Sequence, residues 1–160
     1  MKKQMIKAYL FDWGDTLMVD FPGMSGKMCN WDIVEATYGA QETLAYLSQR
    51  ALLYIATGAS ESTVKDIQTA FSRVGLDYYI TEYFCKANTG LTKGTPEFLE
   101  FILSSLKFSR DNIAMVGDSF EKDIFPAASI GIRSFWLSKS AKSRLPANCV
   151  QISTLLELCR

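Results

Sequence analysis

The feature that most limits how this chain can fold is a series of short apolar runs that end at polar residues. We predict these runs to be strands, and they cover residues 6–12, 51–57, 112–118 and 132–137, with a weaker candidate over 77–84. The runs are nearly continuous in apolar residues instead of alternating, which is typical of parallel strands buried on both faces. The sequence therefore indicates a parallel sheet covered by helices on both sides.

Segments with helical spacing lie between the predicted strands. Apolar side chains recur at helical intervals in residues 60–75, where Ser60 is the expected N-cap and Gly75 the expected C-terminal glycine. A second helix is predicted to begin at Pro96, with Thr95 as its N-cap. Strands that alternate with helices in this way require crossover connections, which place the helices on the faces of the sheet.

A third helix is predicted over residues 120–129, where Pro126 ends or bends it. The tail of the chain is expected to add an edge strand and a final helix. We therefore predict one α/β domain over residues 1–160, with three α/β/α layers and a flavodoxin-like parallel sheet.

Residues 18–38 depart from this alternation, since they carry Pro22, Gly23 and Gly26 and show little periodicity. We expect a long loop with a short helix near residues 32–37, and not a second domain. Several apolar side chains in and before this loop either pack it onto the domain, the reading we favour, or form an apolar rim or dimer contact. They are Trp13, Phe21, Met24, Met28 and Trp31.

Composition excludes several classes of function. Basic and acidic side chains both number 17, so the zero net charge gives no electrostatic reason to expect nucleic acid or an anionic membrane as a partner. No apolar run approaches a membrane span, and the N-terminal segment does not resemble a secretory signal, so we predict a cytoplasmic protein. The chain has no histidine, which removes Ser-His-Asp, Cys-His and HExxH chemistry. The four cysteines are expected to be reduced thiols.

Three polar residues, Asp12, Thr57 and Asp118, come at the predicted carboxyl ends of strands. Ligands bind beyond these ends in parallel sheets, so the three side chains are expected to converge on one crevice. Each residue alone is more often a turn former or a helix cap, and a lone lysine such as Lys93 is usually a solvated surface charge. Their order along the chain is more informative than any one of them.

Four motifs contain these residues: FDWGDTL with Asp12, LLYIATGAS with Thr57, TKGTPEF with Lys93, and MVGDSFEKD with Asp118 and Asp123. In this order, and on these predicted strands and helices, the set resembles the haloacid dehalogenase-like superfamily of phosphohydrolases. The resemblance covers nearly the whole chain.

The resemblance implies a role for each of these residues. Asp12 would be the nucleophile that forms an aspartyl-phosphate, and Lys93 would neutralise the transferring phosphoryl group and hold Asp12 in place. Thr57 would bind a phosphate oxygen, together with the backbone N–H groups of Gly58 and Ala59.

A carboxylate needs a cation before it can approach a phosphate, and the resemblance implies Mg²⁺, which takes hard oxygen ligands. The implied ligands are Asp12, Asp118 and the backbone carbonyl of Gly14. Asp123 and Ser119 would lie in the outer shell, where Asp123 orders either the waters of the metal or Lys93. A helix N-cap explains Ser119 equally well.

The first motif departs from the family at Gly14, where relatives have a second aspartate that serves as general acid and then as general base. Here an acid stands one place later, at Asp15, and a shift of one residue redirects a side chain substantially. Three readings stay open. Asp15 reaches the leaving group through altered loop geometry, or the enzyme works without a protein acid and is slow on poor leaving groups. In the third, the protein binds Mg²⁺ and phosphate with little turnover.

Many relatives insert a cap domain between the first and second motifs, but the corresponding span here is too short for one. Residues 18–38 occupy the cap position, so a nearly capless site is expected. An open site suits a large phosphorylated substrate, unless a partner subunit of a homo-oligomer covers it.

We therefore predict an Mg²⁺-dependent phosphohydrolase that acts through Asp12. The alternative is a catalytically impaired regulatory module of the same fold that binds Mg²⁺ and phosphate. A dehalogenase is less favoured, because those relatives have a substantial cap and no Mg²⁺ site.

Overall fold

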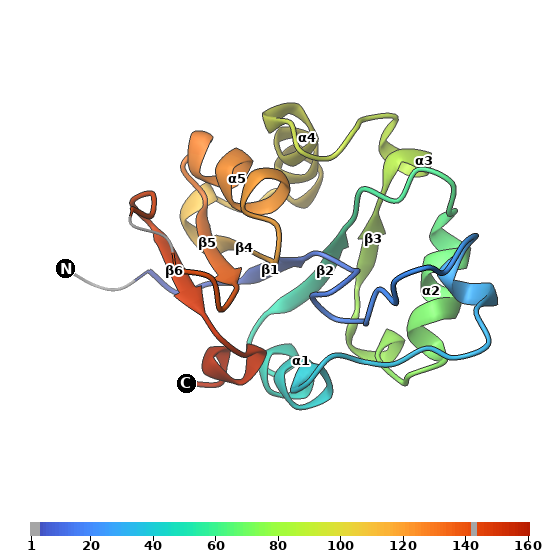
Figure 1. Cartoon of the computed structure of the whole chain (residues 1–160). Helices are drawn as coiled ribbons and strands as arrows, with labels where there is room; N and C mark the ends of the chain where they lie inside the picture. The colour runs from blue at the N-terminus through green and yellow to red at the C-terminus, as the bar shows by residue number, and fades with distance from the viewer. Residues whose placement is uncertain (1–3, 142–143) are drawn as a thin grey trace.

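The computed structural model describes residues 4–141 and 144–160 and shows a six-stranded parallel sheet (Figure 1). Its strand order is β3-β2-β1-β4-β5-β6. The strands are β1 (Ala8–Phe11), β2 (Leu52–Ala56), β3 (Glu82–Phe84), β4 (Ile113–Gly117), β5 (Arg133–Leu137) and β6 (Cys149–Ile152). The parallel α/β architecture that the sequence predicts is confirmed.

The central strand β1 pairs with β2 on one side and β4 on the other. Phe11, the last residue of β1, is in register with Ile55 and Val116. The chain builds the sheet outward from β1 through β2 to β3, and then crosses back to β4. The carboxyl ends of β1 and β4 therefore meet where the winding direction reverses, which is where parallel sheets bind ligands.

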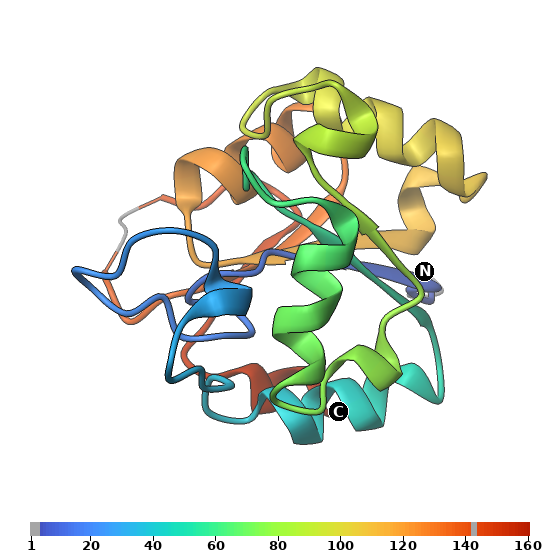
Figure 2. The same ribbon diagram turned by 90° about the vertical axis from the view of Figure 1, so that its right-hand side faces the viewer.

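Helices cover both faces of the sheet (Figure 2). One apolar cluster joins the sheet to α1 (Ala40–Ser48), α2 (Val64–Ser72) and the C-terminal 3₁₀ turn η5 (Leu155–Leu158). The opposite cluster joins it to α4 (Pro96–Leu106) and α5 (Phe125–Ser129). A further short helix, α3 (Lys86–Thr89), follows β3.

The start of α2 corrects one prediction. Thr63, and not Ser60, is the N-cap: its Oγ1 accepts the N–H of Asp66 at 3.1 Å, and the Asp66 carboxylate accepts the N–H of Thr63 at 2.9 Å. This reciprocal capping box satisfies two N–H groups at the helix start, an arrangement that Ser60 does not make here. Gly75 has a φ of 73° beyond the end of the helix, as its predicted place requires.

The predicted helix near residues 32–37 is wrong. The backbone of Val19 donates to the Glu35 carbonyl, and that of Thr37 donates to the Leu17 carbonyl, so both ends of the loop pair with each other. A 3₁₀ turn, η1 (Met28–Asn30), forms earlier in the loop instead. The weak strand candidate over 77–84 is also shorter than predicted, because its first part is the 3₁₀ turn η2 (Asp77–Tyr79).

The remaining predicted boundaries agree closely with the structure. Thr95 and Pro96 begin α4, although the Thr95 side chain makes no capping bond. Pro126 lies where a π-helical turn, η4 (Phe120–Ile124), passes into α5. A further 3₁₀ turn, η3 (Arg110–Asn112), precedes β4. All four cysteines are free, and no helix within the described ranges is long and apolar enough to cross a membrane.

Candidate active site

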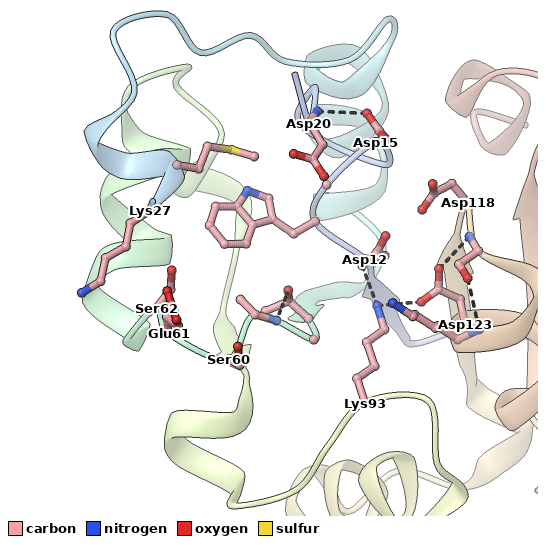
Figure 3. A pocket seen from close by; sticks show the side chains of 18 of the residues that line it. Asp12, Asp15, Asp20, Lys27, Ser60, Glu61, Ser62, Lys93, Asp118 and Asp123 are labelled. Carbon is pink, nitrogen blue, oxygen red and sulfur yellow. Dashed lines mark hydrogen bonds and ion pairs between the residues drawn. The ribbon is translucent and has the colours of Figure 1, made fainter. Parts of the chain in front are cut away.

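One cleft of about 490 Å³ lies beyond the carboxyl ends of β1, β2 and β4 (Figure 3). The site residues predicted from the four motifs all line it. They are Asp12, Gly14, Asp15, Thr57, Gly58, Lys93, Asp118, Ser119 and Asp123. The structure therefore brings the predicted residues together from separate parts of the chain.

Strand ends fix the main chain at the two central acids. The N–H of Asp12 donates to the Val116 carbonyl at 2.9 Å, which extends the β1–β4 pairing by one bond. The carbonyl of Asp118, just after β4, accepts the Trp136 indole N–H at 3.0 Å. Both carboxylates are thus carried by backbone that the sheet holds in place.

We call Asp12, Lys93, Asp118 and Asp123 the floor of the cleft. Within it, Lys93 lies between two carboxylates. Its Nζ is 2.5 Å from Asp12 Oδ1 and 2.6 Å from Asp123 Oδ1. The Lys93 side chain is 6% exposed and that of Asp123 is fully buried. A buried cation shared by two acids holds both in a fixed geometry.

The pKa values of the three floor acids are shifted in different directions. Burial by itself would raise the pKa of Asp12, but the Lys93 ammonium outweighs it and the pKa falls below the usual range. Burial raises the pKa of Asp118 to about 7, and the nearby Asp12 carboxylate adds to the effect. Burial likewise raises the pKa of Asp123 to about 6, against the opposing charge of Lys93.

Asp123 reaches the cleft because Gly117 leaves room for it. A Cβ atom at Gly117 would lie 2.6 Å from the Asp123 Cβ and closer still to its carboxylate. The Ser119 N–H donates to Asp123 Oδ2 at 3.0 Å, and Ser119 Oγ accepts the Lys122 N–H at 3.2 Å. Ser119 therefore caps the π-helical turn, which was one of its two predicted roles.

Thr16 is a site residue that the sequence reasoning missed. It is fully buried, and its Oγ1 lies 3.1 Å from Asp12 Oδ2 and 3.3 Å from Asp118 Oδ1. The hydroxyl can donate to either carboxylate and so links the ends of β1 and β4. Its place inside the first motif, four residues after Asp12, was the available signal.

Thr57 directly follows β2, the strand that pairs with β1 on the side opposite β4. Its side chain is buried, and its Oγ1 accepts the N–H of Ala59 at 3.2 Å. Gly58 passes close to the lysine stem, since a Cβ there would lie 3.4 Å from the Lys93 Cβ. The Ala59 N–H, predicted to face a phosphate, is thus bonded to Thr57 in this structure.

The loop over residues 18–38 forms the opposite wall of the cleft. Trp13, Met28 and Trp31 are buried against α2 and also line the cleft, so they both pack the loop and supply an apolar rim. Met24 remains exposed. Arg73, at the end of α2, donates to the carbonyls of this loop, at 2.5 Å for Trp31.

Asp15, the acid next to Gly14, has a φ of 59° and faces the loop. Its Oδ1 accepts the backbone N–H of Asp20 at 2.9 Å (Figure 3). This bond closes the turn between the two residues. The Asp15 carboxylate therefore has a backbone partner in this structure.

The donor set fits a divalent cation. Carboxylate oxygens from Asp12, Asp118 and Asp123 lie within 4.8 Å of one another. Lys93 pairs with Asp12 and Asp123, while no ion pair is formed by Asp118 among residues 4–141 and 144–160. Three acids with one lysine leave an excess of negative charge, and hard oxygens are the ligands that Mg²⁺ prefers.

Known proteins resemble this chain in sequence and in fold. Residues 26–131, more than half of the chain, match the family described as haloacid dehalogenase-like hydrolase, and this range holds the second, third and fourth motifs. The putative HAD-hydrolase YfnB of Bacillus subtilis is 26% identical over 110 residues, which are 68% of this chain and 45% of that protein. The sequence match thus spans less than half of that relative.

Solved structures share the fold at low sequence identity. An uncharacterized protein from Listeria monocytogenes superposes with a TM-score of 0.82 at 21% identity, covering 95% of this chain and 94% of the other. YfnB, in a crystal form bound to magnesium, gives a TM-score of 0.76 at 16% identity over 96% of this chain and 97% of that one. A HAD phosphatase from Thermococcus onnurineus gives 0.76 at 17% identity over 96% of each chain. With this fold, these motifs and the family match, the chain belongs to the haloacid dehalogenase-like hydrolases.

Proposed function

We propose that the chain is an Mg²⁺-dependent phosphohydrolase that acts through a phosphorylated Asp12. The observation that carries this proposal is the placement of Asp12 beside Lys93, within a group of three carboxylates. The lowered pKa of Asp12 keeps it ionised and able to attack, while Lys93 supplies positive charge where the phosphoryl group arrives.

The first step joins an oxygen of the Asp12 carboxylate to phosphorus. The bond from phosphorus to the leaving oxygen breaks, and this oxygen takes up a proton. Thr57 and the backbone that follows it line the same cleft as Asp12, after the neighbouring strand, and would bind the non-reacting phosphate oxygens.

The second step returns the enzyme to its starting state. A water attacks the phosphorus, loses a proton to a base, and breaks the bond to the Asp12 oxygen, which releases inorganic phosphate. Lys93 keeps the Asp12 side chain in place throughout, because its other contact is to the fully buried Asp123.

Asp12, Asp118 and the Gly14 carbonyl would hold Mg²⁺, with Asp123 and Ser119 around it. When bound, the metal screens the negative charges of the acids and the phosphate. Two findings in relatives support the proposal: a YfnB structure contains magnesium, and the Thermococcus protein is described as a phosphatase.

The cleft also bears on substrate. The loop over residues 18–38 forms one of its walls, and no separate domain covers it among residues 4–141 and 144–160. We propose a phosphorylated substrate that extends beyond the cleft. Cytoplasmic location and oligomeric state stay predictions.

The direct test is phosphate release from an aryl phosphate and an alkyl phosphate, with and without Mg²⁺. We expect metal-dependent release by the wild-type protein and none by Asp12→Asn. Binding of Mg²⁺ without release from either compound, and without phosphorylation of Asp12, would favour the binding module instead.

A further inference from the structure

The proposed reaction needs a proton at the leaving oxygen, and the acids of the floor are poorly placed to supply it. Asp12 is the nucleophile, and Asp123 is held by Lys93 and by the Ser119 backbone. Asp118 is a metal ligand in the proposed site. Three other carboxylates line the cleft: Asp15, Asp20 and Glu61.

Two of these three are less suited than the third. Asp15 directs its carboxylate to the backbone N–H of Asp20. Glu61 lies across the cleft from the floor acids, beside Ser62 and Lys27 (Figure 3). Within residues 4–141 and 144–160, the Asp20 carboxylate makes neither an ion pair nor a hydrogen bond.

Asp20 lies against Gly14, two residues after the nucleophile. A Cβ atom built on Gly14 would be 3.4 Å from the Asp20 Cβ, 3.7 Å from its Cγ and 3.6 Å from Oδ2. Gly14 does not have a positive φ, so its backbone would accept a side chain. Because Gly14 has no side chain, the space beside its Cα is left open, and the Asp20 side chain lies next to that space.

The loop brings Asp20 to this place through its own backbone bonds. The Asp15 N–H donates to the Met18 carbonyl at 2.6 Å, and the Asp15 carboxylate accepts the N–H of Asp20. The Val19 N–H donates to the Glu35 carbonyl at 2.9 Å. Asp15 therefore positions the residue that follows it around the turn.

We infer that Asp20 is the proton-transfer residue of this site. In the first step its carboxyl gives a proton to the leaving oxygen as the bond to phosphorus breaks. In the second step the resulting carboxylate accepts a proton from the water that attacks the phosphorylated Asp12. This inference rests on the proposed phosphohydrolase function. It assigns to Asp20 the general acid and base role that relatives give to an aspartate at the position of Gly14.

The test compares Asp20→Asn with wild type on an alkyl and an aryl phosphate. General acid help is worth about 10²–10⁴ in rate, and a poor leaving group depends on it most. We expect kcat/KM for the alkyl phosphate, which reports the first step, to fall by about that factor and kcat/KM for the aryl phosphate to fall much less. Asp32→Asn is the matched control, an exposed aspartate of the same loop that does not line the cleft, and it should leave both rates unchanged.

A second readout separates proton transfer from loop structure. In Asp20→Asn, rapid quenching and intact-mass measurement should show phosphate accumulating on Asp12, since the base for its hydrolysis is gone. The double variant Gly14→Asp with Asp20→Ala moves the carboxylate by a short distance and should recover alkyl turnover. A purely structural Asp20 would give neither result.

The outcomes distinguish a wrong role for Asp20 from a wrong proposed function. An unchanged alkyl-to-aryl ratio of kcat/KM in Asp20→Asn, or a ratio that shifts in Asp15→Asn instead, overturns the role of Asp20. Wild-type protein that is phosphorylated but releases no phosphate also overturns it, while leaving Asp12 as nucleophile. Wild-type protein that shows neither phosphorylation nor release overturns the proposed function and the role of Asp20 with it.

Discussion

The floor of the cleft and the loop opposite it are held by different forces. In the floor, Asp12 and Asp118 follow paired strands, and Lys93 is buried between Asp12 and Asp123. In the loop over residues 18–38, the side chains are more exposed, and bonds with α2 and with the residue that follows it attach the loop to the domain. Arg73 reaches three loop carbonyls, and Lys27 pairs with Asp66 at 2.8 Å.

This difference predicts that the floor is rigid and is destabilised when one of its charges is removed. The loop is predicted to be more mobile and to depend on the few bonds that attach it to the domain. Buried ion pairs cost much when one partner is lost, whereas exposed ones contribute little. In the proposed reaction, the chemistry that needs fixed distances is located in the floor. Recognition of the substrate and proton transfer are proposed for the loop.

The largest effect is expected for Lys93→Met, which removes the cation from the buried acids. Phosphate release should fall by at least about 10², the usual loss for one charge-stabilising donor. In metal-free protein at pH 8, unfolding by denaturant should require about 3–5 kcal/mol less free energy. Arg110→Met is the matched control, since Arg110 pairs with Glu100 at the surface and its loss should cost less than about 1 kcal/mol. Equal losses in the two variants would contradict a buried cluster.

Gly117→Ala should disturb the floor from within, because the new Cβ would overlap the Asp123 carboxylate. We expect a loss of about 1–3 kcal/mol in denaturant unfolding, as for other overpacked sites, together with weaker Mg²⁺ binding measured by calorimetry. The comparison is Gly14→Ala in the loop wall, where the nearest contact is an ordinary 3.4 Å. Its stability should stay within about 1 kcal/mol of wild type. The same loss at both glycines would show that the two walls do not differ.

Arg73→Met should loosen the loop without altering the floor. Three hydrogen bonds from one exposed guanidinium are lost, and we expect about 1 kcal/mol of destabilisation. Trypsin should cut faster after Lys27, and KM should rise more than kcat falls. Arg50→Met serves as control, because the Arg50 guanidinium contacts Tyr46 of α1, away from the cleft. Unchanged cleavage after Lys27 would argue against Arg73 as the attachment.

The smallest effect is expected in the pH dependence of metal-free protein. The folded pKa values of Asp118 and Asp123, about 7 and about 6, lie above the ordinary value of 3.8. Protonated carboxyls therefore favour the fold below about pH 4, and this contribution is lost as pH rises through 6 and 7. The lowered pKa of Asp12 acts only at more acidic pH.

Thermal unfolding in EDTA should show this loss between pH 5 and 8 as a falling midpoint. Asp118→Asn should flatten the change, and Mg²⁺ should restore stability most at the higher pH. Because Asp118 is only partly buried, water screens its charge and the effect is modest. A midpoint that rises with pH in EDTA would contradict raised pKa values in the floor.

The sequence was most informative about the floor. Continuous apolar runs predicted the strands, and polar residues at their ends predicted which side chains would meet, since the parallel sheet aligns those ends. Lys93 could be placed only through the resemblance, because no local pattern predicts that a lysine before a helix turns inward. Thr16 was missed because its neighbours in space, Asp12 and Asp118, come from two strands.

The loop was less predictable for a physical reason. Residues 32–37 were expected to be helical, but bonds to Leu17 and Val19 hold that stretch extended. The attachment by Arg73 joins residues about forty positions apart, with no periodic signal between them. The contact of Asp20 with Gly14 likewise depends on the turn that Asp15 closes.

The measurement that tests the central claim most directly is the intact mass of protein quenched during turnover of an activated aryl phosphate with Mg²⁺, followed by peptide mapping. We predict one covalent phosphate, located on Asp12 and absent from both Asp12→Asn and metal-free samples. Phosphate release that proceeds without any phosphorylated Asp12, or that persists in Asp12→Asn, would contradict it.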